Sequence, residues 1–425
     1  MISEGQELEL TIEKPAAGGR MIARHHGQIV FVRGAIPGER VRAWIDRVDR
    51  QLAHAVVRTV IEPSPDRREP AADPLCGGSL YGHIAYPRQL QIKQQVIQDA
   101  FARIGRLSLD APVDVRPSPE HGYRMRARLH VRGARAGFYR EGTHQLCDAA
   151  STGQLSAEAV ESVALVAAAI DREMAGALAS IEVSENMAGD QRALHFDLAP
   201  GARLERGHLE RARPAGVTGI SARGPSLALI EAGEPAVSDP LSSLAGSGVA
   251  GDLRRRAESF FQANRFLVAD LVTAVLALVP LNGEVLDLYS GVGLFAVVLA
   301  AAGAERVTAV EGDRASGDDL ARNAAPFRAR LAVHQQPVEE YLRRRTGPAA
   351  ATLIVDPPRT GLSKDAAAAI IAHGSPRVVY VSCDPPTLAR DARRLLDAGY
   401  ALTSIRALDF FPNTPHLETV GVFER

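Results

Sequence analysis

The chain has 425 residues, too many for one compact hydrophobic core, and its 46% apolar content suffices to fill two or three. Lysine and arginine total 49 against 50 aspartate and glutamate residues, so the net charge of -1 excludes a global attraction to nucleic acid or membrane. The start of the chain lacks the basic and apolar regions of a secretory signal, and no apolar stretch is long enough to span a bilayer. We therefore expect a soluble, cytoplasmic monomer with no membrane partner, in which any contact with nucleic acid is local.

The first segment, residues 1–62, alternates apolar and polar positions, as in 8–12 and 28–32. Short strands separated by turn residues at this spacing predict a small, OB-like β-barrel. The stretch 63–74 is rich in proline and charge, and it predicts a linker.

The middle region, residues 75–255, predicts a mixed α+β domain. Helical periodicity covers 86–104 and 156–178, and alternation over 123–139 predicts a hairpin. Small residues dominate from 236 to 251, where we expect a loose connection.

One strand of the predicted hairpin places Arg124, Arg126, Arg128 and His130 on a single face, because side chains alternate along a strand. No acidic residue lies between 121 and 140. This pattern fits a surface that contacts RNA phosphates and unpaired bases, and it fits equally a solvated basic hairpin.

The last region, residues 256–425, predicts strands that alternate with helices, which is typical of a doubly wound, Rossmann-like α/β domain. The last two predicted strands lie close together, which allows the sheet to end in an antiparallel strand. The predicted strands are 284–288, 306–310, 352–355, 377–381, 402–408 and 418–423.

A nucleoside-binding pattern follows the first of these strands. Gly291 and Gly293 allow a sharp turn, and Glu311 ends the next strand, where a carboxylate can accept hydrogen bonds from ribose hydroxyls. With Ala296, the glycines also fit the G-x-G-x-x-A pattern of dinucleotide-binding proteins. Asp287 would repel a pyrophosphate but suits the cationic amino-acid end of S-adenosylmethionine, which we therefore favour.

Cys383 lies between the apolar run 378–381 and a predicted helix. A thiol at such a junction is held rigidly near amides that favour the thiolate, as a nucleophile requires. The alternative is a small, buried apolar side chain. With Cys76 and Cys147, the chain has three widely separated cysteines, a number that fits reduced thiols better than a disulfide framework and cannot complete a four-cysteine metal site.

These motifs together resemble the S-adenosylmethionine-dependent RNA uracil-C5 methyltransferases, which make 5-methyluridine. The resemblance spans the whole last domain in the family's order. The matching segments are FFQAN at 260–264, DLYSGVG at 287–293, Glu311, DPPRTG at 356–361, SCDP at 382–385 and HLET at 416–419.

The resemblance implies a role for each of six residues. It implies that Cys383 is the nucleophile that adds to carbon-6 of uracil and that Glu418 is the base that removes the carbon-5 proton. Without the resemblance, Glu418 reads as a surface carboxylate on the last strand. The residues implied to contact S-adenosylmethionine are Gln262, Tyr289, Glu311 and Asp356.

The segment 34–39 makes the N-terminal barrel resemble the TRAM module of the family's ribosomal-RNA members. The implied partner is therefore RNA, with 23S ribosomal RNA favoured over tRNA. The sequence departs from the family at Asp384, where Asn is usual, and at Leu294, where some members have a cofactor-contacting Asn. Many TRAM-bearing members bind an iron-sulfur cluster through four cysteines, but Ser79 replaces one of them here, so we expect no cluster and no metal.

Two other functions remain open on the sequence. An amino-group methyltransferase acting on adenine or guanine would use the turn at 356–358 without a covalent thiol, although Arg359 stands where such sites usually place an aromatic residue. A non-catalytic RNA-binding protein would use the barrel and the basic hairpin alone.

Overall fold

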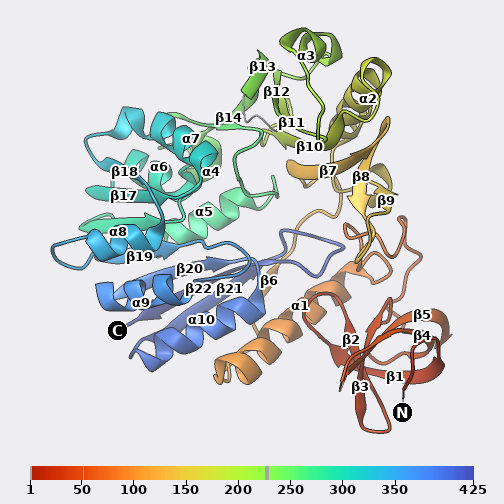
Figure 1. Cartoon of the computed structure of the whole chain (residues 1–425). Helices are drawn as coiled ribbons and strands as arrows, with labels where there is room; N and C mark the ends of the chain where they lie inside the picture. The colour runs from red at the N-terminus through yellow and green to blue at the C-terminus, as the bar shows by residue number, and fades with distance from the viewer. Residues whose placement is uncertain (1, 51, 225–228) are drawn as a thin grey trace.

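The computed structural model describes residues 2–50, 52–224 and 229–425. Its N-terminal part is the predicted barrel, which closes in the order β1-β2-β3-β5-β4 and lies at the lower right of Figure 1. Alternate residues of β1 point inward, so Leu8, Leu10 and Ile12 are buried in the barrel core. The strands are β1 (Glu7–Pro15), β2 (Met21–His25), β3 (Gln28–Arg33), β4 (Arg40–Val48) and β5 (Leu52–Glu62).

The central part is a seven-stranded sheet in the order β13-β12-β11-β10-β7-β8-β9, with α2 (Ala157–Glu173) and α3 (Arg206–Ala212) packed on it. Helix α2 begins where the Ser156 hydroxyl caps the backbone N–H of Ala159. The strands are β7 (Arg126–Arg132), β8 (Arg135–Tyr139), β9 (Leu146–Asp148), β10 (Leu178–Glu185), β11 (Arg192–Leu198), β12 (Gly219–Arg223) and β13 (Leu229–Gly233).

The C-terminal part is an eight-stranded sheet in the order β18-β17-β16-β19-β20-β22-β21-β6. Strand β22 runs antiparallel to both of its neighbours, which confirms the antiparallel ending expected from the sequence. The strands are β6 (Val115–Arg116), β16 (Glu284–Leu288), β17 (Arg306–Glu311), β18 (Leu331–Gln335), β19 (Thr352–Val355), β20 (Arg377–Ser382), β21 (Ala401–Leu408) and β22 (Glu418–Glu424).

Helices cover both faces of this sheet, as a doubly wound fold requires (Figure 1). One hydrophobic core contains Leu271 of α5 and Val297 of α6, and the other contains Ile97 of α1 and Leu388 of α10. The helices are α1 (Tyr86–Ala100), α5 (Val268–Leu276), α6 (Leu294–Ala301), α7 (Arg314–Ala324), α8 (Val338–Arg344), α9 (Lys364–His373) and α10 (Pro385–Asp397).

The proposed division into 1–62, 75–255 and 256–425 cuts across some of this packing. Strand β6, from the middle region, pairs with β21 at the edge of the C-terminal sheet, and α1 contacts both α10 and β1. The middle region therefore contributes secondary structure to the C-terminal sheet.

The expectation of a loose connection at 236–251 was wrong. This segment forms β14 (Ala236–Pro240) and α4 (Leu241–Ala245), and β14 pairs with β15 (Asp252–Arg256). A buried ion pair between Asp239 and Arg255 joins the two strands. Buried Leu241, Leu244 and Val249 hold the segment against the hydrophobic core that contains α5.

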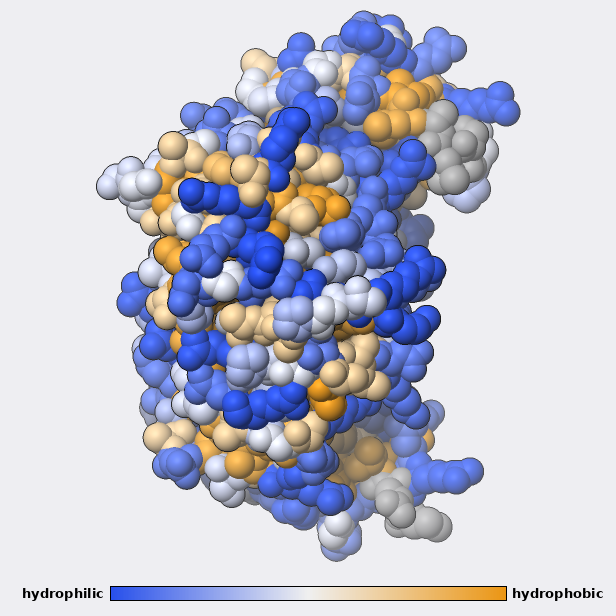
Figure 2. All heavy atoms as spheres, turned by 90° about the vertical axis from the view of Figure 1, so that its left-hand side faces the viewer, coloured by the Kyte–Doolittle hydropathy of each residue, from blue (hydrophilic) through white to orange (hydrophobic). Residues whose placement is uncertain are grey.

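Among the residues that the structure describes, no helix is long and apolar enough to cross a membrane. On the face shown in Figure 2, hydrophobic residues lie in scattered patches among hydrophilic ones. Isolated apolar residues of this kind are ordinary on a protein surface.

Candidate active site

A cavity of about 880 Å³ opens at the carboxyl ends of the parallel strands of the C-terminal sheet. Ligands of open α/β sheets bind at this edge. All six site residues expected from the sequence line the cavity: Gln262, Tyr289, Glu311, Asp356, Cys383 and Glu418.

The turn after β16 forms one wall of the cavity. Tyr289, Gly291 and Gly293 all have positive φ angles, of 62°, 56° and 97°. A Cβ atom on Gly293 would lie 2.7 Å from Cγ2 of Val297, so the turn requires glycine there to pack against α6. Tyr289 is not a glycine, yet its backbone adopts the left-handed conformation. Strained conformations of this kind are concentrated at functional sites.

Glu311 ends β17 and fixes this turn from the neighbouring strand. Its Oε2 accepts the backbone N–H of Gly291 at 2.7 Å, and its Oε1 accepts that of Asp313 at 2.6 Å. Burial raises the pKa of Glu311, although these two backbone donors oppose the shift. The carboxylate is therefore held rigidly beside the glycine turn.

Asp287 lies below the same turn and is fully buried. Its Oδ2 accepts the N–H of Ala296 at 3.0 Å, whereas its Oδ1 has no hydrogen-bond partner among the described residues. Burial raises the pKa of Asp287 to about 8. Asp287 is not among the residues that line the cavity, and its contact with Ala296 holds the first turns of α6 beneath the glycine turn.

Asp356 follows β19 and faces Gln262 across the cavity. The Gln262 amide donates to Oδ2 of Asp356 at 3.3 Å. Burial raises the pKa of Asp356 to about 7, and the nearby Glu311 adds to the shift. Because Glu311 and Asp356 both line the cavity, its acidic lining favours a cationic ligand over an anionic one.

Cys383 lies at the junction of β20 and α10, as expected, but its thiol is not acidic. Burial raises the pKa of Cys383 to about 12, and the Glu418 carboxyl also raises it, whereas the Arg359 guanidinium lowers it. The expectation that helix amides favour the thiolate was wrong, because burial and Glu418 dominate the pKa and because Pro385 and Pro386, which begin the helix, have no N–H group. The next N–H, that of Thr387, donates to Asp384 at 2.8 Å.

Glu418 is the first residue of β22 and lies beside the Cys383 strand. The antiparallel register pairs Ser382 with Thr419. Because Cys383 follows Ser382 and Glu418 precedes Thr419, the two reactive residues are neighbours at the same edge of the sheet. Glu418 is buried, and its Oε2 has no partner among the described residues. Burial and the Asp356 carboxyl raise the pKa of Glu418 well above its usual value, against the opposing effect of Arg359.

The central domain closes the other side of the cavity, which sequence reasoning did not predict. Arg124 and Arg126 line the cavity together with Phe411 from the loop before β22. The Arg124 guanidinium lies 5.2 Å from the ring centre of Phe138 and 5.7 Å from that of Phe411. The alternation of 124–130 indicated a polar face, but the sequence carried no signal that this face meets the C-terminal domain.

The alternation of the basic strand is confirmed, but its arginines are not free of acids. Arg126 pairs with Glu182 of β10 at 2.6 Å, and Arg128 pairs with Asp197 of β11 at 2.6 Å. The absence of acids within the hairpin is offset by acids from the neighbouring strands. The face is therefore a mixed network of charges.

The expectation that all three cysteines are reduced was also wrong. Cys76 and Cys147, 71 positions apart in sequence, form a disulfide, and Cys383 remains the one free cysteine in the described part of the chain. The fold brings the segment that contains Cys76 against strand β9, which contains Cys147. Separation along the chain therefore did not predict separation in space. Within the described ranges, no group of three or more histidine, cysteine, aspartate or glutamate residues is arranged to hold a metal ion.

The fold and this cavity are those of a Rossmann-like methyltransferase domain joined to a small β-barrel. Residues 346–425 match the family model described as tRNA (Uracil-5-)-methyltransferase, and residues 3–57 match the TRAM domain. The chain belongs to the RNA uracil-5-methyltransferase family, and it carries a TRAM domain.

Full-length relatives support this membership. The chain is 32% identical to the 23S rRNA (uracil(1939)-C(5))-methyltransferase RlmD of Pseudomonas putida, over 99% of this chain and 94% of the relative. It is 31% identical to an uncharacterized RNA methyltransferase of Streptomyces coelicolor, over 99% and 93%.

A solved structure shares the fold. The Pyrococcus abyssi tRNA (uracil-54, C5)-methyltransferase in complex with S-adenosyl-L-homocysteine superimposes with a TM-score of 0.74. The match covers 98% of this chain and 100% of that one, at 24% identity.

Proposed function

We propose that the protein methylates carbon-5 of a uridine in 23S ribosomal RNA through a covalent adduct with Cys383. The observation that carries this proposal is the shared cavity. Cys383 and Glu418 extend from adjacent antiparallel strands into the space that the cofactor-binding candidates Glu311 and Asp356 also line. Nucleophile, base and cofactor pocket thus meet at one point.

The residues of the cavity fit S-adenosylmethionine. Gln262, Tyr289, Glu311 and Asp356 would hold it, and when bound it supplies a methyl group on a positively charged sulfur. The carboxyl groups of Glu311 and Asp356 in the lining of the cavity support a cationic ligand here.

Cys383 activates the uracil. The thiol gives its proton to water, the sulfur bonds to carbon-6, and the ring electrons shift to carbon-5, which becomes nucleophilic enough to accept a methyl group. Ionised Glu418 then takes the proton from carbon-5, and the carbon–sulfur bond breaks. The proton on Glu418 returns to the departing thiolate, so one turnover releases a single proton overall.

The reaction needs Glu418 ionised and Cys383 deprotonated, yet the structure raises the pKa of both groups. A nearby positive charge lowers the pKa of a thiol and of a carboxyl. Arg359 supplies such a charge permanently, and the bound sulfonium adds a second one. Cofactor binding therefore prepares both groups for the reaction.

The choice of 23S ribosomal RNA rests on the TRAM domain and on the relatives. RlmD of Pseudomonas putida, whose name specifies a 23S uridine, aligns over nearly the full length of both chains. The fold alone also suits a tRNA uridine, as the Pyrococcus abyssi enzyme illustrates. A target uracil must leave its stack to reach a buried thiol, so a loop or single strand is the expected site in either RNA.

Nucleoside mass spectrometry would test the function directly. Ribosomal RNA and tRNA from cells with and without the gene are digested, and any lost 5-methyluridine is mapped. Loss from one 23S position supports the proposal, and loss from tRNA moves the substrate to tRNA. Unchanged 5-methyluridine in both would overturn it.

A further inference from the structure

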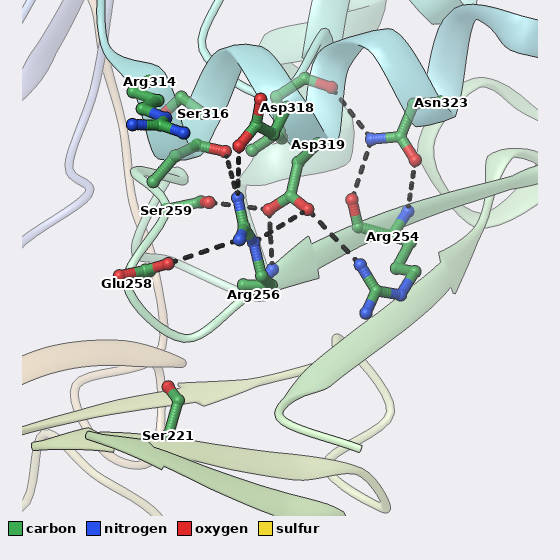
Figure 3. Close-up of polar contacts among 12 residues, drawn as sticks. Ser221, Arg254, Arg256, Glu258, Ser259, Arg314, Ser316, Asp318, Asp319 and Asn323 are labelled. Atoms are coloured by element: carbon green, nitrogen blue, oxygen red, sulfur yellow. Dashed lines mark hydrogen bonds and ion pairs between the residues drawn. The ribbon is translucent and has the colours of Figure 1, made fainter. Parts of the chain in front are cut away.

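One face of α7 carries three polar residues that point toward β15 and the loop that follows it (Figure 3). Ser316, Asp319 and Asn323 recur at spacings of three and four, so they share one side of the helix. All three are buried, with 2%, 2% and 5% exposure. A buried polar face on a helix calls for specific partners.

Asp319 has the most partners of the three. Its Oδ2 accepts the backbone N–H of Arg256 at 2.8 Å and the hydroxyl of Ser259 at 2.6 Å. Its Oδ1 lies 3.3 Å from a guanidinium nitrogen of Arg254 and 3.3 Å from Nε of Arg256. Two cations and two neutral donors therefore converge on one carboxylate (Figure 3).

The other two residues extend this connection to the walls of the cavity. The Asn323 amide donates to the carbonyl of Val292, inside the glycine turn, at 2.9 Å and to the carbonyl of Arg254 at 2.7 Å. The Ser316 hydroxyl accepts the N–H of Phe260 at 3.4 Å. Helix α7 thus joins the glycine turn to the loop that leads to Gln262.

We propose that Asp319 is a positioning residue for the adenosyl cofactor, an inference that rests on the proposed function. Asp319 is not among the residues that line the cavity. It holds Ser259, and Ser259 directly precedes Phe260, which lines the cavity two residues before Gln262. Its carboxylate fixes the position of this loop relative to the glycine turn.

A neutral isostere should disturb this arrangement. In Asp319→Asn, one oxygen of the carboxylate becomes an N–H₂ group, which must face either the arginines or the donors from Arg256 and Ser259. The new N–H₂ group then faces other hydrogen-bond donors instead of acceptors, and the two guanidinium groups lose the buried negative charge of the carboxylate. The loop is free to shift, although no group that contacts the cofactor has changed.

The experiment compares Asp319→Asn with Asp318→Asn in the full-length protein. Asp318 is the next residue on the same helix, is 53% exposed and lies 3.6 Å from Arg256 at the surface. The control therefore removes the same charge without touching the buried contacts. Binding of S-adenosylhomocysteine is measured by calorimetry, and KM for S-adenosylmethionine, KM for RNA and kcat are measured separately.

For Asp319→Asn we expect the Kd for S-adenosylhomocysteine and KM for S-adenosylmethionine to rise about tenfold to a hundredfold. KM for RNA and kcat at saturating cofactor should change less than about threefold. The Asp318→Asn control should match the wild type. A folded Asp319→Asn protein with wild-type cofactor affinity, or one that loses only kcat, would overturn the inference.

A milder variant keeps the test decisive if Asp319→Asn does not fold. Ser259→Ala removes one hydrogen bond to Asp319 and should raise the cofactor Kd about threefold to tenfold. Wild-type cofactor affinity in Ser259→Ala would then overturn the inference. Failure of the wild-type protein itself to bind the cofactor would instead refute the proposed function.

Discussion

The two sides of the cavity differ in how fully their carboxyl groups are hydrogen-bonded. On the cofactor side, both oxygens of Glu311 accept backbone hydrogen bonds. On the side of the reacting base, Oε2 of Glu418 has no partner among the described residues, and burial raises the pKa of the Cys383 thiol. The fold itself holds Glu311 in place, whereas Cys383 and Glu418 depend on charges that ligands bring.

The largest effect should come from removing the nucleophile. Cys383→Ala leaves Glu311 and the glycine turn intact but removes the group that makes carbon-5 of uracil reactive. We expect methyl transfer to fall by about 10⁴-fold or more, with Kd for S-adenosylhomocysteine within about twofold of the wild type. Transfer of a radiolabelled methyl group to RNA measures the loss of activity, and calorimetry measures the Kd for S-adenosylhomocysteine. Normal turnover by this variant would refute the covalent mechanism.

The next effect should come from the base. Glu418→Gln permits attack by Cys383 and methyl transfer, but it blocks removal of the carbon-5 proton and so traps the adduct. We expect kcat to fall by about 10² to 10⁴, and a band of RNA-linked protein to persist in denaturing gels. Cys383→Ala combined with Glu418→Gln is the control and should show no such band. If Glu418→Gln turns over normally and forms no lasting adduct, Glu418 is not the base.

The same division explains what the sequence could predict. Glu311 and Cys383 each follow a hydrophobic run that marks a strand of the sheet, so the pattern itself indicated their positions, whereas Glu418 was indicated only by the family resemblance. Strand β18 was missed because it lies at an exposed edge, and the apolar part of its sequence, Leu331–Gln335, is only three residues long. The segment that follows it reaches the cavity, which Pro337 and Val338 help to line.

Contacts between distant segments could not be predicted in this way. Nothing in the pattern around Arg124 indicates Phe411 as its neighbour, and nothing near Cys76 indicates Cys147. The pKa of Cys383 was misjudged for a related reason. The motif showed a helix beginning beside the thiol, but the effect of burial and of Glu418 depends on strands that meet only in the folded protein.

The rate at which Cys383 is alkylated tests whether the thiol depends on the charge of the bound ligand. If ligand charge prepares Cys383, S-adenosylmethionine should accelerate its alkylation by iodoacetamide at pH 7.5 by about tenfold, because a positive charge nearby lowers the thiol pKa. S-adenosylhomocysteine has the same shape without the charge and should not accelerate it. Cys383→Ala gives the background, which should be low because Cys76 and Cys147 are joined in a disulfide. Equal acceleration by both ligands would show that closure of the site, and not charge, controls the thiol.

The smallest effect concerns the carboxyl group that the cofactor side leaves without a full set of partners. Asp287 has a pKa of about 8 in the folded protein, above the value of about 3.9 in an unfolded chain. The folded state therefore holds its proton across a range in which the unfolded state has lost it. This contribution to stability is present below about pH 4 and is lost as the pH rises toward 8.

We expect Tm to be about 2 to 4 °C lower at pH 8 than at pH 6 without cofactor, since titration of Asp287 acts in this direction. Asp287→Asn should flatten this dependence, because the amide keeps an acceptor for Ala296 and does not ionise. Calorimetric melting of both proteins at the two pH values gives the comparison. Adding S-adenosylmethionine to the wild type should also flatten it, since a positive charge near Asp287 stabilises its ionised form. If Tm depends on pH in the same way in Asp287→Asn and in the wild type, Asp287 is already ionised in the folded protein. The fold would then hold Asp287, like Glu311, ready for the cofactor without help from a ligand.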